Sequence, residues 1–218
     1  MARVSGLQGD ATLVGIDYRV ANGLLYGVGN AGGIYTINES NAVANKVAQL
    51  TVALSGTSFG VDVNPAADAL RIIGDDGQNL RFSFTAGTTT VDGPLTYPPA
   101  TTLATGVTGA VYTNNDADPN TATTLYDLDT NLDQIAIQSP ANSGQLAATG
   151  KLTVDAGTNA GFDIYSTIAD GSTVDVEGYA TLQVNGSYRL YEITLFNGKA
   201  TDMGAFSVAT RSSTWRSR

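Results

Sequence analysis

The side chains best suited to binding chemistry are concentrated in the first half of the chain. They combine carboxylate, amide and guanidinium groups, and the candidate binding residues are Asp17, Arg19, Asp62, Asn64, Asp68, Arg71, Asn79 and Arg81. If these groups converge on one channel, they could bind a carboxylate, a sugar or a cation. The structural alternative, which we favour, is that Asp and Asn accept hydrogen bonds from turn amides while Arg pairs with Asp of a neighbouring unit.

A second acidic segment offers metal chemistry. Asp116, Asp118 and Asn120 place three oxygen ligands in one loop, with Asp127 and Asp129 nearby. Calcium prefers such hard oxygen ligands, so it is the one cofactor that the sequence suggests. The loop lacks the central Gly and the distal Glu of an EF-hand, and an ordinary solvated turn is the alternative.

The composition offers few residue types that could carry out catalysis. The 218 residues include no His and no Cys, which excludes Ser-His-Asp and Cys-His catalysis and nearly all zinc chemistry. Paired carboxylates remain, for example Asp17 with Asp62 or Asp175 with Glu177, but nothing in the sequence sets their separation. We therefore expect a protein that is not an enzyme.

The charge balance limits the partners. Lys and Arg number 11 against 20 Asp and Glu, a formal net charge of −9, so nucleic-acid phosphates and anionic lipids would be repelled. No run of about 18 apolar residues occurs, and the start has no apolar stretch typical of a signal peptide. We expect neither nucleic-acid binding nor membrane insertion.

A repeated tripeptide indicates which elements must position these residues. Gly15-Ile16-Asp17 returns as Gly60-Val61-Asp62 and Gly161-Phe162-Asp163, with a weaker echo at Gly109-Ala110-Val111. Intervals of about 50 residues are typical of propeller blades. The glycine is expected to permit close approach near the axis, and the Asp to bind a neighbouring turn or Arg more readily than a substrate.

Each unit contains four short segments rich in β-branched and aromatic residues, separated by Asn-Gly, Asp-Gly or Asn-Pro turns. The sequence therefore predicts an all-β fold, a small β-propeller or propeller-like array of four-stranded antiparallel blades, with a shared or incomplete fifth. The four units of this single domain cover residues 8–50, 57–95, 106–152 and 159–206, and residues 207–218 form a basic tail.

The two ends look like strands without partners. Residues 3–7 look like an outermost strand, and residues 205–210 look like the first strand of a further unit. They would pair with each other in a closed ring, or with neighbouring molecules in a homo-oligomer or polymer. The side chains expected to carry such assembly are Arg3, Val4, Leu7, Phe206, Val208, Trp215 as an anchor, and Arg211, Arg216 and Arg218 as rim charges.

Several segments carry a resemblance to a known family. They are GIDYR at 15–19, FGVDVNPAADALR at 59–71, GQNLR at 77–81, YTN at 112–114 and QSPANSG at 138–144. Together they resemble a bacterial, mostly exported family of unknown function. The resemblance implies propeller-like β repeats and an extracellular or cell-surface location, and it implies no particular activity. Family members typically have further strands before the segment that begins here at Arg3, and this departure leaves open whether the ring closes within one chain.

These observations favour a non-enzymatic, exported structural or interaction module that self-associates through its terminal strands, for example in a fibre or surface assembly. One alternative is a propeller that binds a carbohydrate or another small ligand, with carboxylate-dependent catalysis as its extension. An intracellular scaffold is the other.

Overall fold

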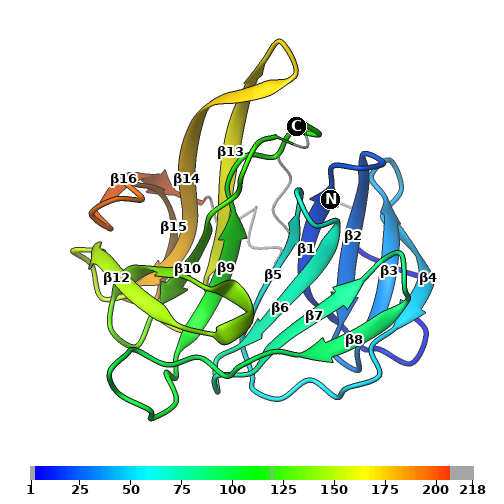
Figure 1. The fold of residues 1–218 in the computed structure, drawn as a ribbon, viewed down its shortest axis with the longest axis horizontal. Coiled ribbons are helices and arrows are strands. Elements are labelled where there is room, and N and C mark those ends of the chain that lie inside the picture. The colour runs from blue at the N-terminus through cyan, green and yellow to red at the C-terminus, as the bar shows by residue number, and fades with distance from the viewer. Residues whose placement is uncertain (1–2, 119, 207–218) are drawn as a thin grey trace.

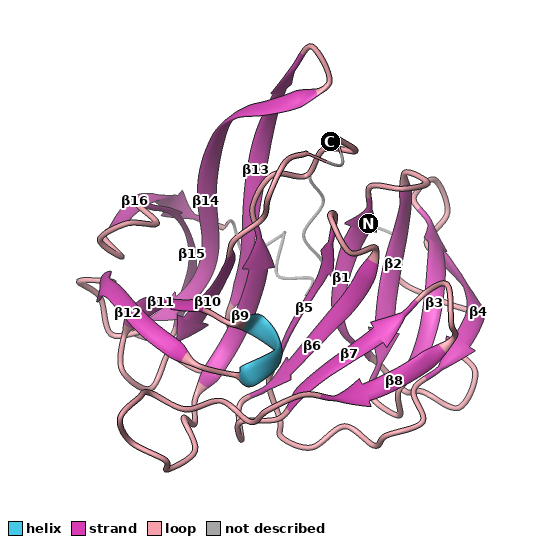
Figure 2. Ribbon diagram, viewed as in Figure 1, coloured by secondary structure: helices cyan, strands magenta, loops and turns pink. Residues whose placement is uncertain are grey.

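The computed structural model describes residues 3–118 and 120–206, and almost all of its regular structure is β-strand (Figure 2). The first sheet contains β1 (Leu13–Arg19), β2 (Leu24–Gly29), β3 (Gly33–Asn38) and β4 (Val43–Gln49). The second contains β5 (Phe59–Asn64), β6 (Ala69–Gly74), β7 (Asn79–Ser83) and β8 (Thr88–Val91).

The other two sheets follow the same order along the chain. The third contains β9 (Val107–Tyr112), β10 (Leu125–Asp129), β11 (Gln134–Gln138) and β12 (Leu146–Lys151), with the short helix η1 (Ala141–Ser143) before its last strand. The fourth contains β13 (Gly161–Ala169), β14 (Ser172–Val184), β15 (Ser187–Ile193) and β16 (Ala200–Ala205).

Each sheet is an antiparallel meander in which consecutive strands pair, and the four sheets are the blades of a β-propeller (Figure 1). The first strands of the blades lie innermost, with β1 packed beside β5, β5 beside β9, and β9 beside β13. The expected all-β propeller of four-stranded blades is therefore confirmed. No fifth sheet occurs among the residues that the structure describes.

The repeated glycine marks the point where neighbouring blades approach most closely. A side chain at Gly15 would lie 2.5 Å from Val61, and one at Gly60 would lie 2.4 Å from the backbone N of Ala110. Gly109 faces the Cβ of Phe162 in the same way, at 2.8 Å. The absence of a side chain at these positions lets the inner strands pack almost backbone to backbone, as expected from the repeat.

The last member of the series behaves differently. A side chain at Gly161 of β13 would meet nothing within 4 Å. In the described part of the chain, β13 and β1 also lack the extensive contact that joins the other neighbouring inner strands. The ring of blades is therefore held by three strand-to-strand interfaces rather than four.

Three large apolar cores fill those interfaces, and a smaller cluster of Val111, Ile164 and Leu195 adds to the last of them. The first joins blades one and two through Val28, Ile34, Leu70 and Ile72. The second joins blades two and three through Ile73, Tyr112 and Leu125. The third joins blades three and four through Leu128, Ile135, Leu182 and Ile193. Burial of apolar area against the next blade is thus the main force that stacks the repeats.

The ends of the chain differ from the sequence-based expectation. Ser5 forms a parallel bridge to Val43, which places the N-terminal segment along the outer edge of the first blade. Ala205 ends β16 rather than opening a further unit, and the Phe206 N–H donates to the carbonyl of Tyr188 in the same blade. The expected strand 205–210 is therefore wrong at its start, and Val208 lies outside the described residues.

The fourth blade holds the largest difference in element length. The sequence indicated strands at 160–165 and 179–184, but β13 and β14 continue toward each other and meet at the turn Asp170-Gly171. Both turn residues have positive φ, 52° and 85°, as a tight hairpin turn requires. We call residues 165–177 the arm, and it projects beyond the blades at the top of Figure 1.

Candidate functional site

The structure separates the eight candidate binding residues into three groups rather than one channel. Asp17 and Asp62 meet at the propeller axis, Arg19 pairs with Asp68, and the remaining four line or support a pocket between blades two and three.

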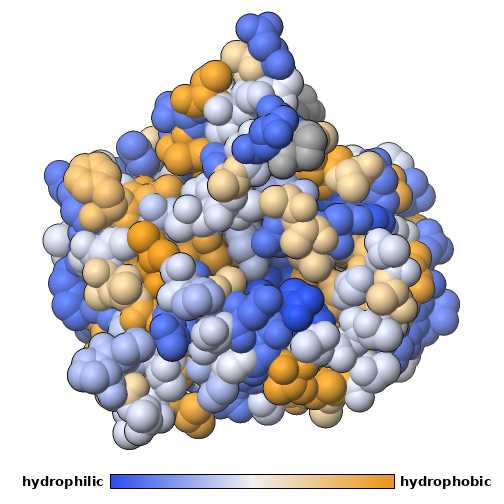
Figure 3. All heavy atoms as spheres, in the orientation of Figure 1, coloured by the Kyte–Doolittle hydropathy of each residue, from blue (hydrophilic) through white to orange (hydrophobic). Residues whose placement is uncertain are grey.

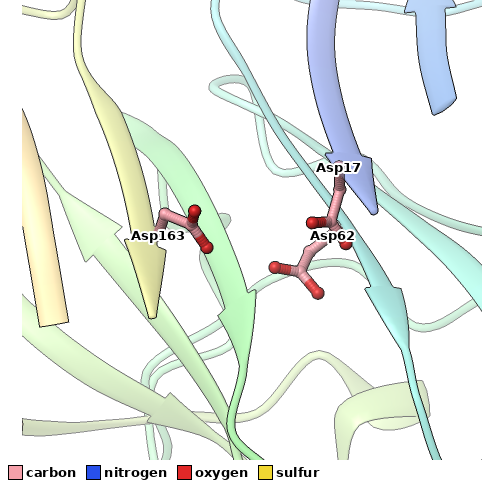
Figure 4. A group of neighbouring side chains, drawn as sticks. All are labelled: Asp17, Asp62 and Asp163. Atoms are coloured by element: carbon pink, nitrogen blue, oxygen red, sulfur yellow. The ribbon is translucent and has the colours of Figure 1, made fainter. Parts of the chain in front are cut away.

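The axial group gains a third member, Asp163 (Figure 4). Asp17, Asp62 and Asp163 occupy the same position of the repeat on β1, β5 and β13, and each offers one carboxylate oxygen within 4.8 Å of the other two. Val111 takes this place on β9 and packs instead against Ile164 and Leu195. We call the three carboxylates the axial cluster.

Backbone amides hold two of these carboxylates between blades. The Val63 N–H donates to Asp17 Oδ2 at 2.7 Å, and the Tyr112 N–H donates to the Asp62 carboxylate. In both cases the donor is the residue after the repeat position of the next blade. Asp163 instead accepts from its own neighbour, Ile164, at 2.7 Å, so it lacks the bond to the next blade.

The axial cluster has strongly perturbed titration. Burial, with the charge of Asp163 as the next cause, raises the pKa of Asp17 to about 7. Burial and the charges of Asp17 and Asp163 raise the pKa of Asp62 well above its ordinary value. Surrounding protein also raises the pKa of Asp163, although part of that side chain remains open to solvent. Like charges this close favour proton or cation uptake.

The second group is a bridge between blades. Arg19 donates from Nε to Asp68 Oδ1 at 2.6 Å and from Nη2 to the other oxygen of the same carboxylate. Its guanidinium carbon also lies 4.3 Å from the ring centre of Phe84. This arrangement matches the structural alternative for Arg and Asp, since both groups are occupied by each other.

The third group surrounds the buried guanidinium of Arg71, which does not face the axis. Arg71 donates to the Tyr112 hydroxyl, and its remaining contacts fix the boundary between blades two and three. The other acceptors are Asn79 Oδ1, Asp92 Oδ2 and Asn142 Oδ1, each at 2.7 Å. Arg81 donates to both oxygens of Asp92, at 3.1 and 3.2 Å.

A pocket of about 290 Å³ opens beside this network. It is lined by Asn64, Ala67, Arg71, Arg81, Tyr112, Pro140, Ala141 and Asn142. Figure 3 shows strongly hydrophilic side chains gathered over the middle of this face, where blades two and three meet. We call this hollow the interblade pocket.

The interblade pocket is rich in free hydrogen-bond donors. Asn64 and Asn142 each use only the side-chain oxygen, for Ala67 N–H and Arg71 respectively, so their NH₂ groups have no partner in the described chain. Nη1 of Arg81 likewise makes no described hydrogen bond. Two guanidinium groups share one carboxylate, Asp92, which leaves the pocket locally positive on an acidic protein.

Asp127 is a further buried acid near this boundary. It is fully buried on β10, and neither carboxylate oxygen has a hydrogen-bond partner among the described residues. Burial raises the pKa of Asp127 well above its ordinary value, although the charge of Arg71 acts in the opposite direction. The surroundings of Asp127 therefore favour the protonated acid over the carboxylate.

The loop considered for calcium serves as an anchor for the arm. Asp116 accepts from the backbone and hydroxyl of Thr173, and Asp118 accepts from Ser172 and from Asn120. Burial acts to raise the pKa of Asp116, yet the hydrogen bonds from Thr173 hold it below its ordinary value. The calcium hypothesis for this loop stays a prediction. Asp129 accepts from the Tyr97 hydroxyl, and the Asp127 oxygens have no hydrogen-bond partner among the described residues.

The two carboxylate pairs considered for catalysis have different surroundings. Asp17 and Asp62 lie within hydrogen-bonding reach of each other, whereas Asp175 and Glu177 lie on the exposed part of β14. Asp175 accepts from Val176 N–H, and Glu177 accepts from the Tyr179 hydroxyl. Only the axial pair has the close approach that proton sharing requires.

The residues expected to carry assembly are only partly described. Arg3, Val4 and Leu7 belong to the segment along β4, and Phe206 continues the edge of the fourth blade. Trp215, Arg211, Arg216 and Arg218 lie outside the described residues. Within those residues, no helix is long and apolar enough to cross a membrane.

Sequence reasoning missed four residues that complete these sites. Asp163 was visible as the third Gly-x-Asp repeat, which is the signal that could have added it to Asp17 and Asp62. Tyr112 and Asn142 lie in the motifs YTN and QSPANSG, but nothing in the sequence linked these motifs to Arg71. Asp92 had no sequence signal, because its role depends on how Arg71 and Arg81 are placed beside it.

Comparisons with known proteins support the fold and family. No curated protein sequence matches the chain. It is similar in structure to a crystal structure described as an auxiliary nutrient binding protein from Bacteroides ovatus, with a TM-score of 0.54, 12% identity, and coverage of 90% of this chain and 48% of that one. The chain spans about half the length of that protein, and likeness at this identity shows the fold alone.

A family model described as a domain of unknown function (DUF4394) matches residues 1–214, so the chain belongs to this family.

Proposed function

We propose that this chain is a non-enzymatic binding module of an exported protein, and that it holds a small acidic ligand, such as a sugar acid, in the interblade pocket. The observation that carries the proposal is the shared carboxylate: Arg71 and Arg81 both pair with Asp92, so one positive charge has no counter-charge at the pocket. The free groups at the rim are donors, which suits an acceptor-rich ligand.

The two arginines of the pocket have different roles: Arg71 shapes the wall, and Arg81 is available to bind a ligand. Arg71 is buried, and four acceptors fix its guanidinium, so it forms a rigid wall. Arg81 is about one-third exposed and keeps unused N–H groups toward solvent. A ligand carboxylate beside Arg81 and the Asn142 amide would therefore gain charge-assisted hydrogen bonds without rearranging the pocket.

Two further observations support this proposal. The described chain shows no His or Cys, and the interblade pocket contains no carboxylate that faces a free nucleophile, which favours binding over catalysis. A protein of similar fold is described as binding nutrients. Binding of nutrients outside the cell also agrees with the extracellular or cell-surface location that the family resemblance implies.

Calorimetric titration tests the proposal. D-galacturonate, D-glucuronate and succinate would be titrated into the full chain at low ionic strength, with D-galactose as the uncharged match for galacturonate. We expect at least one acidic ligand to bind, galactose to bind more weakly, and Arg81→Gln to weaken acidic-ligand binding by about 10-fold or more. Arg189→Gln is the matched control, because Arg189 pairs with Asp202 far from the pocket.

Two results would contradict this function. One is the absence of binding heat with every acidic ligand at millimolar concentration. The other is unchanged affinity in Arg81→Gln, which would mean that the free guanidinium N–H groups do not contact the ligand.

Self-association is a second candidate function, and the arm favours it. Tyr165, Ile168 and Val174 are exposed there by 60%, 45% and 63%, and Figure 3 shows hydrophobic side chains along this projection. We propose that a second copy of the chain covers this apolar surface, in a homo-oligomer or a longer surface assembly. The described terminal segments pair within their own blades and therefore give less support to terminal strand exchange.

Light scattering coupled to size-exclusion chromatography tests this second candidate. We expect wild-type protein to associate with rising concentration and the double variant Ile168→Ser/Val174→Ser to remain monomeric. Met203→Gln serves as the control, because Met203 is 55% exposed but lies on β16. A wild-type chain that stays monomeric at every concentration would exclude the idea.

A further inference from the structure

The axial cluster lacks a positive partner. Asp17 accepts from Tyr18 and Val63 N–H, Asp62 from Tyr112 N–H, and Asp163 from Ile164 N–H. All these donors are neutral backbone amides, and no Arg or Lys pairs with the cluster within the described residues. Three carboxylates at the axis therefore depend on protons or on a cation for their neutralisation.

Asp62 adds a second observation that points to a ligand. Its side chain is only 2% exposed, and its Oδ1 has no hydrogen-bond partner among the described residues. Figure 4 shows the Asp62 carboxylate directed into the space between the inner strands, toward Asp163. A buried carboxylate oxygen without a partner is costly, and a group that fills this space would remove that cost.

We propose that Asp17, Asp62 and Asp163 bind one Ca²⁺ ion, which ties the fourth blade to the first and second at the propeller axis. The donor set is made of carboxylate oxygens alone, which suits a hard cation and not zinc or copper. Nothing assigned to the interblade pocket takes part, so the two sites are independent.

The geometry of the axial cluster suits Ca²⁺. Oxygens within 4.8 Å of one another can be bridged by one ion with metal–oxygen bonds of about 2.3–2.6 Å, as Ca²⁺ forms. Mg²⁺ demands near-ideal octahedral geometry with bonds of about 2.0–2.1 Å, whereas Ca²⁺ accepts flexible coordination, so carboxylates from three separate strands favour Ca²⁺. Three protein ligands leave further Ca²⁺ positions for water, so we expect weak binding, with Kd about 10⁻⁴–10⁻³ M.

The position of the ion gives it a structural role. The other neighbouring inner strands are held by close glycine contacts, and blades one to three also by the amide bonds to Asp17 and Asp62. Asp163 has neither a bond to the first blade nor a close contact beside Gly161. A cation shared with Asp17 and Asp62 would supply the link that the described chain lacks at this point.

The test uses the full chain stripped of metal with EDTA and then dialysed. Ca²⁺ and Mg²⁺ are titrated separately by calorimetry at pH 8, and the Ca²⁺ titration is repeated at pH 6 in two buffers of different ionisation enthalpy. We expect one Ca²⁺ per chain, weaker Mg²⁺ binding, and proton release that is larger at pH 6 than at pH 8. Ca²⁺ should also raise the unfolding temperature by several degrees at millimolar concentration.

Two variants make the test specific. Asp163→Asn should weaken Ca²⁺ binding by about 10-fold or more and remove the temperature shift, because it deletes one of three charges. Asp163 is partly exposed, so folding should survive. Asp175→Asn is the matched control: Asp175 also accepts from the amide that follows it, but it lies on the arm. The Ca²⁺ affinity of the Asp175→Asn variant should equal that of the wild type.

The proposal fails on any of three results. These are no saturable Ca²⁺ binding up to about 10 mM, equal losses of affinity in Asp163→Asn and Asp175→Asn, or tighter binding of Mg²⁺ than of Ca²⁺. If Asp163→Asn proves unfolded, Asp62→Asn provides the same comparison from the second blade.

Discussion

Asp17 in the first blade accepts a hydrogen bond from the backbone N–H of Val63 in the second, at 2.7 Å. The same relationship joins Asp62 to the Tyr112 N–H of the third blade. A side chain that satisfies the neighbouring strand's amide fixes the register between two blades, which hydrophobic packing alone does not specify. The repeated Asp therefore has a structural role in blades one and two, and that role ends at Asp163.

The raised pKa of Asp17 gives the protein an unusual dependence of stability on pH. Its pKa is about 7 in the folded chain against an ordinary 3.8, so between these values the folded state binds more protons than the unfolded state. In metal-free buffer the free energy of unfolding should therefore fall as pH rises from about 4 to about 7, by on the order of 1 kcal/mol per pH unit. Urea denaturation at several pH values measures it.

Asp17→Asn is the variant that isolates this effect. An amide keeps an oxygen for the Val63 N–H but takes up no proton, so the slope of stability against pH should become shallower. A variant with the wild-type slope would show that another group titrates in this range.

The close approach of the inner strands predicts a sharp contrast between two glycines at the same repeat position. Gly60→Ala would place a Cβ 2.4 Å from the Ala110 backbone, which forces β5 away from β9 and should cost about 1–3 kcal/mol or more. Gly161→Ala meets nothing within 4 Å and should change stability by less than about 0.5 kcal/mol. Urea denaturation of both variants decides it; equal losses would mean that β13 is packed as tightly as the others.

The fold was predictable because several independent features of each repeat indicate the same four-stranded unit. The Gly-x-Asp tripeptide, the turn dipeptides and the short β-branched segments all indicated four-stranded blades, and each feature alone would be weak. The arm was missed although Asp170-Gly171 is a strong hairpin signal, because the acidic residues Asp175 and Glu177, close to the exposed Val174, resemble a solvated loop. A hairpin that is largely exposed leaves only a weak apolar pattern.

The sites were predictable only as a set of residue types. The sequence places Arg71 and Asp17 in equivalent polar settings, yet Arg71 faces the next blade while Asp17 faces the axis. Asp62, the equivalent of Asp17 in blade two, lies directly opposite Arg71 in the pairing of β5 with β6, so the two side chains share one face of that blade. Asp62 joins the axial cluster because β5 is the innermost strand, whereas Arg71 lies one strand further out and meets Tyr112 of the third blade. Which partners a side chain meets depends on how the blades pack, which sequence spacing does not reveal.

The bridge between Arg19 and Asp68 should contribute more than an ordinary surface ion pair. Arg19 makes two hydrogen bonds to one carboxylate and stacks over Phe84, and lysine can reproduce neither contact. We expect Arg19→Lys to lower the free energy of unfolding by about 1–2 kcal/mol. Arg189→Lys is the matched control, since Arg189 and Asp202 are more exposed and belong to one blade; its loss should stay below about 0.5 kcal/mol. If the two variants lost similar amounts of unfolding free energy, the stacking of Arg19 on Phe84 would contribute nothing beyond an ordinary surface ion pair.

The buried Asp127 should make the stability of the protein depend on pH. Its two oxygens have no partner in the described chain, and burial raises its pKa well above the ordinary value, so folding favours the protonated acid. At pH 8 the unfolded chain has this group ionised, and folding must take up a proton at a cost that grows with pH. Asp127→Asn needs no proton, so it should be more stable than the wild type at pH 8, and the advantage should shrink at pH 5. Asp175→Asn, an exposed change of the same chemistry, should show no such trend. A difference in stability between Asp127→Asn and the wild type that stays the same at pH 5 and pH 8 would show that Asp127 takes up no proton on folding.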